Sequence, residues 1–312
     1  MTSLFASGAM TKLSGPCLEL SSPAATAAHP ASGDELVRTL YAFNRGRLRP
    51  GRPGDGWRKA LLDEVPLLLA EGEWVEQERR AMASRVAEVP TEPDAFVAWF
   101  ESLKQEGPGQ GDPLFPWLAN EASVESMRWF LQQEVAGEAG FDDLVALTQL
   151  KLPRRPKLEL ARNYWDEMGR GQEKAMHGPL LDSLADELHL TSDVDDVVAE
   201  SLALANLLVA FALNRRYAYQ SIGALGAIEL TAPGRAEQVN AGLARLGLSP
   251  AARRYFALHA TLDVKHSEAW NREVLRPLVA ADSSLARPIA EGALLRLMAG
   301  ARCFERYRRA LG

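Results

Sequence analysis

Residues 258–270, "LHATLDVKHSEAW", contain two of the chain's five histidines with an aspartate between them. His259, Asp263 and His266 are spaced i, i+4 and i+7, so on an α-helix their side chains lie within about 60° of one another and share a face. The helical rise of about 1.5 Å per residue separates the Cα atoms of the two histidines by roughly 10 Å. That separation is awkward for one metal ion and suits two ions with Asp263 between them. A polar stripe on a surface helix is the alternative, and this stretch alone does not decide between the two.

The rest of the chain has helical periodicity almost throughout. Strand-like alternation with paired turn signals is missing, which indicates an all-α protein and argues against a βαβ fold. Clusters of Gly and Pro separate the expected helices, among them "EGPGQGDP" at 106–113 and "TAPG" at 231–234. The expected helices cover residues 33–44, 56–71, 73–87, 92–105, 121–135 extending towards 150, 157–168, 171–188, 194–230, 235–246, 250–275 and 284–310.

This pattern predicts three parts: a flexible leader over residues 1–32, an N-terminal helical subdomain over 33–115, and a compact helical bundle over 116–312. The formal net charge of −6 argues against a nucleic-acid partner, which would require a basic face. No apolar run is long enough to span a membrane. Cys17 and Cys303 form neither a disulfide framework nor a CxxC metal site, so a cytoplasmic location is expected. The N-terminal helical extension has an amphipathic face, which is compatible with a homodimer.

Two acidic residues lie where the pattern predicts apolar surroundings. Glu134, in "MRWFLQQEVAGEAGF", shares a helix face with Phe130 and Phe141, and a carboxylate there costs several kcal/mol unless it is paired or bound to metal. A helix salt bridge is the alternative for Glu134, and Glu138, one turn on, is the rival ligand. Glu229 ends the apolar stretch "YQSIGALGAIEL", and its alternative is a helix-end acid near solvent.

A fourth segment, "NYWDEMGRGQEKAMHGPL" at residues 163–180, contains Glu167 and His177 ten residues apart. On an unbroken helix the two side chains would point about 80° apart. Gly169 and Gly171 lie between them, so a kink or break at the glycines is expected. Alone this is a weak signal, because a single histidine is more often structural than a ligand.

Together these segments supply enough ligands for a centre of two metal ions. Four carboxylates would balance the charge of two Fe(II) ions, and three neutral imidazoles would complete a set with open positions for O2. Oxygen-rich ligation with imidazoles suits iron or manganese better than a Cys-bound structural zinc. The predicted metal ligands are Glu134, Glu167, His177, Glu229, His259, Asp263 and His266.

The order and spacing of these residues resemble the haem-oxygenase-like diiron oxidase family, whose members are iron-containing redox enzymes. The resemblance is carried by "FLQQE", "DEMGRGQEKAMH", Glu229 and "HATLDVKH", and covers residues 116–312. It implies a seven-helix bundle, two Fe ions, O2 as co-substrate with a peroxo-diferric intermediate, and a small organic substrate. Because no GxGxxG occurs in a βαβ context, the reducing electrons would come from an external electron donor.

Glu167 as an additional carboxylate is similar to the N-oxygenating branch of that family. The desaturase and decarboxylase branches instead place a Glu seven residues before the histidine, and here that position is Arg170. The resemblance therefore implies N-oxygenation of a small amine- or amino-acid-like metabolite, with oxidative desaturation or C–C cleavage of a carboxylic acid as the alternative. A metal-free, thiaminase-like hydrolase would need a nucleophilic cysteine, for which the bundle offers only Cys303. A third class of function is that of a non-catalytic metal-binding protein. For the preferred diiron enzyme, no catalytic nucleophile is expected.

Candidate substrate contacts flank the ligand segments. Two adjacent arginines could hold a substrate carboxylate, although neighbouring side chains on a helix cannot both face one pocket. The candidates are Tyr164, Trp165, Arg215, Arg216, Tyr219 and Gln220.

Overall fold

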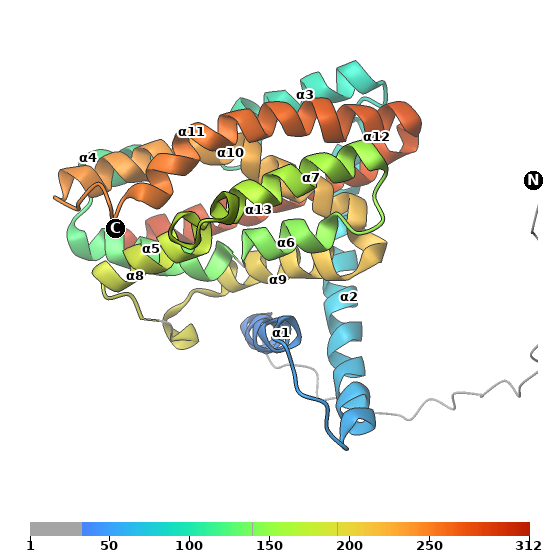
Figure 1. Ribbon diagram of the computed structural model, residues 1–312, viewed down its shortest axis with the longest axis horizontal. Coiled ribbons are helices and arrows are strands. Elements are labelled where there is room, and N and C mark those ends of the chain that lie inside the picture. The colour runs from blue at the N-terminus through green and yellow to red at the C-terminus, as the bar shows by residue number, and fades with distance from the viewer. Residues whose placement is uncertain (1–32, 139, 192) are drawn as a thin grey trace, which may run out of the picture.

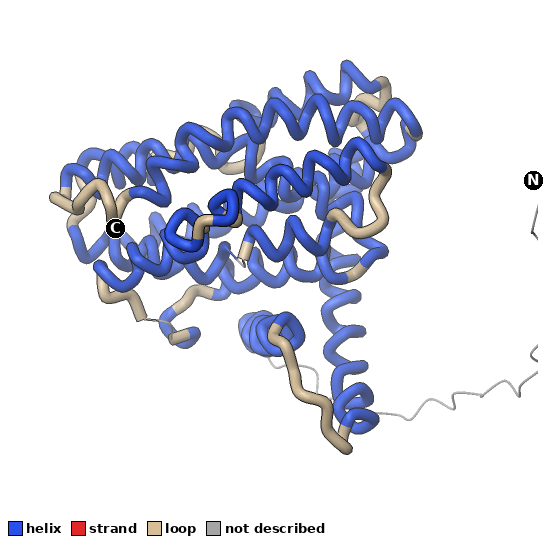
Figure 2. Tube along the Cα trace, in the orientation of Figure 1, coloured by secondary structure: helices blue, strands red, loops and turns tan. Residues whose placement is uncertain are grey.

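The computed structural model describes residues 33–138, 140–191 and 193–312, and within those residues it contains helices and no strand (Figures 1 and 2). The all-α prediction is confirmed over this part of the chain. The predicted leader at residues 1–32 lies outside the described residues. No helix of the described part is long and apolar enough to cross a bilayer.

The helices follow one another through short connections. In chain order they are α1 Gly33–Leu48, α2 Trp57–Ala87, α3 Pro93–Glu106, α4 Leu114–Asn120, α5 Val124–Glu138, α6 Phe141–Thr148, α7 Arg154–Glu167, α8 His177–Glu187, α9 Ala199–Leu213, α10 Ala218–Arg245, α11 Arg254–Trp270, α12 Arg276–Ala281 and α13 Ala286–Leu311. Short 3-10 turns precede α8, α9, α10 and α13, and one π-helical segment, Asn271–Leu275, joins α11 to α12.

Helix α10 is the centre of the bundle. It packs against α13, α11 and α4, while α9 packs against α1, α5, α6 and α13 (Figure 1). The first half of α2 projects away from the bundle with Trp57, Leu61 and Leu62 exposed. Its second half buries Val75 and Met82 in the same hydrophobic core as the helices of the bundle.

Four predictions about helix boundaries are wrong. The expected extension of helix 121–135 towards residue 150 does not occur, because α5 ends at Glu138 and α6 begins separately at Phe141. The expected helices 56–71 and 73–87 form the single helix α2, which contains Pro66. The expected helix 194–230 is interrupted at the 3-10 turn Arg215–Tyr217, where Asn214 caps the turn by accepting from the backbone N–H of Arg216. The "TAPG" segment does not break α10, which continues through Pro233 although a proline cannot donate to the carbonyl four residues earlier. Packing of α10 against three helices overrides that local cost.

The break predicted at the glycines of residues 163–180 is confirmed. Helix α7 ends at Glu167 and α8 begins at His177. Gly169 and Gly171 have φ angles of 60° and 83°, and Arg170 between them has a φ of 55°. A Cβ at Gly169 would lie 2.4 Å from the carbonyl carbon of Ala175, so only glycine allows this close return of the chain. The turn lets the end of α7 face the start of α8.

Candidate metal centre

Helices α7, α8, α10 and α11 converge on one buried cluster of carboxylates and imidazoles. Six of the seven predicted ligands meet there, and apart from His259 each is at most 7% exposed. Five of the six form two groups, within each of which the ligand atoms lie within 4.8 Å of one another; Glu167 belongs to both groups, and Asp263 lies 3.9 Å from His266 of the second. The six residues are Glu167, His177, Glu229, His259, Asp263 and His266.

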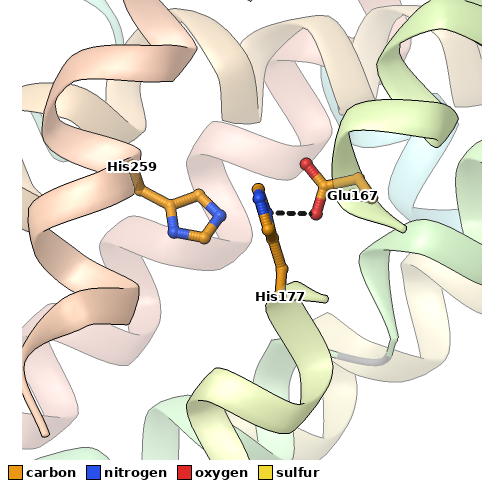
Figure 3. A group of neighbouring side chains, drawn as sticks. All are labelled: Glu167, His177 and His259. Carbon is orange, nitrogen blue, oxygen red and sulfur yellow. Dashed lines mark ion pairs between the residues drawn. The ribbon is translucent and has the colours of Figure 1, made fainter. Parts of the chain in front are cut away.

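The first group consists of Glu167, His177 and His259 (Figure 3). Nδ1 of His177 lies 2.6 Å from Oε2 of Glu167. The rings of His177 and His259 meet edge to face with centroids 4.6 Å apart. Nδ1 of His259 donates to the backbone carbonyl of Tyr255 at 2.8 Å. That hydrogen bond fixes the tautomer and leaves Nε2 of His259 as the atom available to a metal.

The second group consists of Glu167, Glu229 and His266. Nδ1 of His266 lies 3.4 Å from Oε2 of Glu229, and its Nε2 donates to Asp166 at 3.2 Å. The other oxygen of Glu229 accepts from the Asn163 amide at 2.5 Å. The hydrogen bond to Asp166 therefore directs Nδ1 of His266 into the cluster.

The chemistry of these side chains fits a pair of divalent cations. Among the described residues, the buried Oδ1 of Asp263 has no hydrogen-bond partner, and Nδ1 of His177 and of His266 face the carboxylates of Glu167 and Glu229 without a well-formed hydrogen bond. Buried polar atoms are rarely left in this state, and three of them occur together here. Buried carboxylates that face one another repel unless cations lie between them. Iron held by imidazoles and carboxylates matches this donor set.

The pKa values of the three histidines differ because their neighbours differ. Burial, with a contribution from His266, lowers the pKa of His177 to about 4. Burial, together with His177, lowers the pKa of His259 to about 4. Burial also acts to lower the pKa of His266, but Glu229, Asp166 and Glu167 outweigh it and raise that pKa to about 9. Burial and the charges of Glu229 and Glu167 raise the pKa of Asp263 well above its ordinary value.

Sequence reasoning missed three residues that support the centre: Asp166, Arg170, and Asn163, whose amide donates to Glu229. Asp166 precedes Glu167 in the chain and holds His266 in place. Arg170 turns towards Asp166, with its Nε donating at 2.6 Å. The available signal was the helical spacing of Asn163, Asp166 and Glu167 on α7, which puts one polar face towards the bundle.

Glu134 lines the same cavity but belongs to neither group. Its partners are Tyr307, which hydrogen bonds to it, and the guanidinium groups of Arg296 and Arg235. Burial raises the pKa of Glu134 against the opposing effect of these three groups. The side chain of Glu138, the rival candidate, lies outside the described residues.

The cavity has a volume of about 160 Å³ and runs from the cluster to the two arginines. None of the six candidate substrate contacts lines it. Trp165 is 53% exposed. Arg215 donates to the carbonyls of Leu147, Thr148 and Leu150, and Arg216 pairs with Glu76. Gln220 donates to Glu291, and Tyr164 and Tyr219 pack against the hydrophobic core.

A family model described as iron-containing redox enzyme matches residues 128–301. The chain belongs to this family of iron-containing redox enzymes. The matched residues include every member of the buried cluster, and the family membership indicates an iron-dependent oxidoreductase with a haem-oxygenase-like bundle.

Among solved structures, the chain is similar to a CADD-like protein of unknown function from Nostoc punctiforme PCC 73102. The two share 19% sequence identity with a TM-score of 0.54, over 70% of this chain and 99% of that protein. At that identity the likeness supports the fold alone. A search of curated protein sequences found no match to the chain.

Iron binding by this member of the family is expected to tighten as pH rises from about 6 to about 8. His266, with a pKa of about 9, carries a proton over this range and must lose it before Nδ1 can bind a metal, whereas His177 and His259, at about 4, are already neutral. Each released proton makes the affinity rise by about tenfold per pH unit, with a plateau above the pKa of His266. Anaerobic Fe(II) titration against a competing chelator at three pH values measures the slope. A pH-independent affinity would contradict the protonated state assigned to His266.

Proposed function

We propose that this iron-containing redox enzyme is an O2-dependent diiron oxygenase that oxidises nitrogen in a small amine- or amino-acid-like metabolite, with electrons from an external donor. The observation that carries the proposal is the position of Glu167. Its carboxylate belongs to both groups of ligand atoms, as a residue shared by two adjacent ions must. Glu167, His177 and His259 would hold one ion, Glu167, Glu229 and His266 the other, and Asp263 lies within reach of the second group at 3.9 Å from His266.

N-oxygenation is supported by the residues between α7 and α8. The ligand set takes Glu167 from the end of α7, ten residues before His177. At position 170, where the desaturase and decarboxylase branches of the family that this sequence resembles place a Glu, the chain has an arginine whose side chain pairs with Asp166. That position therefore offers no ligand, and Glu167 supplies the carboxylate instead.

Two ferrous ions, when bound, would supply the electrons that activate O2. The chain's own residues would position and shield that chemistry. Asp166 and the Tyr255 carbonyl fix the two imidazoles of α11, and the Asn163 amide orients Glu229. Apolar side chains that include Phe141, Leu208 and Ile228 line the cavity and would limit the access of water to the reacting groups.

A hydrolase that uses Cys303 as nucleophile is not supported. This cysteine is fully buried in α13 and does not line the cavity. Burial, with the charge of Glu134, raises the pKa of its thiol to about 12, so the reactive thiolate is disfavoured.

Product analysis tests the proposed reaction. The protein is loaded anaerobically with Fe(II), mixed with a reductant and a panel of amines and amino acids, and exposed to ¹⁸O2. We expect mass spectrometry to find a product with one labelled oxygen on nitrogen, and no product from Glu167→Gln. Loss of two hydrogens or of carbon dioxide would assign the chain to the desaturase or decarboxylase chemistry instead, and the absence of any O2-dependent product across the panel would count against the proposal.

A further inference from the structure

The cavity of the candidate metal centre also has a basic region. Arg235 of α10 and Arg296 of α13 both line it. Arg235 lies six residues after Glu229 on the same continuous helix, which places it about 9 Å further along the helix axis. Metal ligands and arginines are therefore at separate positions along one cavity.

The positive charge of the two arginines exceeds the negative charge of the acidic side chains that interact with them. The acids that interact with the pair are Glu134, which acts on both, and Asp112, which acts on Arg235. Asp112 is itself in an ion pair with Arg308. Among the described residues, one unshared carboxylate, that of Glu134, therefore faces two guanidinium groups. If Glu134 binds a metal instead, the excess of positive charge is larger. A buried excess of positive charge is costly unless an anion joins it.

Both guanidinium groups retain donors for such an anion. Arg235 lies over the rings of Phe304 and Phe115, with its Cζ 5.0 and 5.7 Å from their centroids. It donates to the Gln110 side-chain oxygen at 2.8 Å, in the amide orientation that satisfies both ends of that side chain. Within the part of the chain that the structure describes, the buried Nε of Arg296 has no hydrogen-bond partner. A guanidinium group that stacks on aromatic rings can still donate hydrogen bonds from the N–H groups at its edge.

We propose that Arg235 and Arg296 bind a carboxylate of the substrate, so that the substrate is an amino acid whose carboxylate lies far from the oxidised nitrogen. The inference rests on the proposed function for placing the nitrogen at the metal ligands. Arginine is suited to the carboxylate end because its planar fork binds both oxygens. The helix positions of Glu229 and Arg235 are about 9 Å apart along the axis, and an extended chain of about eight atoms has a similar length, at about 1.2 Å per bond, which sets the length of the probes used below.

Binding measurements with simple probes test this assignment. Isothermal titration of the full-length, anaerobically Fe(II)-loaded protein compares octanoate with octanol, and 8-aminooctanoate with octylamine. We expect each carboxylate to bind about tenfold or more tightly than its neutral-ended counterpart, as two charge-assisted hydrogen bonds would give. Equal affinities within each pair would overturn the inference.

The carboxylate of octanoate could bind to the arginine pair or to the iron, and arginine variants distinguish these two modes of binding. Arg296→Gln and Arg235→Gln are expected to weaken octanoate about tenfold or more while leaving octanol unchanged. Arg302→Gln, two turns nearer the end of α13 and paired with Glu78, is the matched control and should change neither. Unchanged octanoate affinity in both arginine variants, with iron still bound, would overturn the inference.

Gly300→Ala provides a test that retains both charges. A Cβ at Gly300 would lie 2.8 Å from Nη1 of Arg296, so the added methyl group displaces the guanidinium and should weaken octanoate binding. This variant and the wild-type comparison still decide the matter if the arginine variants fail to fold. Carboxylate selectivity without any oxidised nitrogen product would overturn the proposed function alone, and an oxidised nitrogen product without carboxylate selectivity would overturn this inference alone.

Discussion

Replacing His259 and His266 together with alanine is expected to abolish iron binding, whereas either single replacement should reduce two ions per chain to one. Each histidine belongs to a different group of ligand atoms, so its loss leaves the other group intact. After the double replacement each group keeps only two protein ligands, Glu167 with His177 in the first and Glu167 with Glu229 in the second, and the shared Glu167 cannot make up for the missing imidazole in both. Anaerobic Fe(II) titration followed by metal analysis of the desalted protein gives the stoichiometry.

His189→Asn is the matched control. His189 is an exposed histidine with a φ of 52° at the end of α8, and asparagine tolerates that left-handed conformation. It should bind two ions like the wild type, with an unchanged helical circular-dichroism spectrum. Retention of two ions by the double variant would show that the cluster on α11 is not the iron site.

Helical periodicity made the centre on α11 predictable. A residue's direction on a helix follows from its number alone, so His259, Asp263 and His266 could be placed on one face before any contact was known. The glycines at 169 and 171 gave a second local signal, because positive φ angles there end α7 and allow His177 to meet Glu167. Local geometry thus accounts for most of the candidate ligand set.

Contacts between distant segments could not be derived in the same way. Arg235 was separated from Glu229 by an expected break at 231–234, yet tertiary packing keeps Pro233 inside α10. Arg296 lies on another helix, and which arginine reaches the cavity depends on how α10 and α13 pack. Arg215 lies close to the ligand segments in sequence, but its side chain forms hydrogen bonds with backbone carbonyls near the end of α6.

The packing that brings these arginines together depends on two glycines, and Gly223→Ala or Gly292→Ala is expected to destabilise the protein strongly. A Cβ at Gly223 of α10 would lie 1.8 Å from the carbonyl oxygen of Ile289, and one at Gly292 of α13 would lie 1.9 Å from that of Gln220. Both obstacles are backbone atoms, which cannot turn aside as a side chain can, so the helices must separate. We expect a loss of at least about 3 kcal/mol in the free energy of unfolding and a fall in Tm of at least about 6 °C.

Gly234→Ala distinguishes this steric effect from helix propensity. Gly234 lies on the same helix, α10, but a Cβ there would meet nothing within 4 Å. Alanine should therefore stabilise the helix by about 0.5–1 kcal/mol, and urea denaturation of the three variants measures the difference.

Because Glu229 and Arg235 lie on α10 and Arg296 on α13, separation of these helices would also widen the cavity between the metal ligands and the arginines. A folded Gly223→Ala protein should accordingly lose octanoate affinity, and if it keeps both wild-type stability and wild-type affinity, the close approach of the two helices does not hold the cavity together.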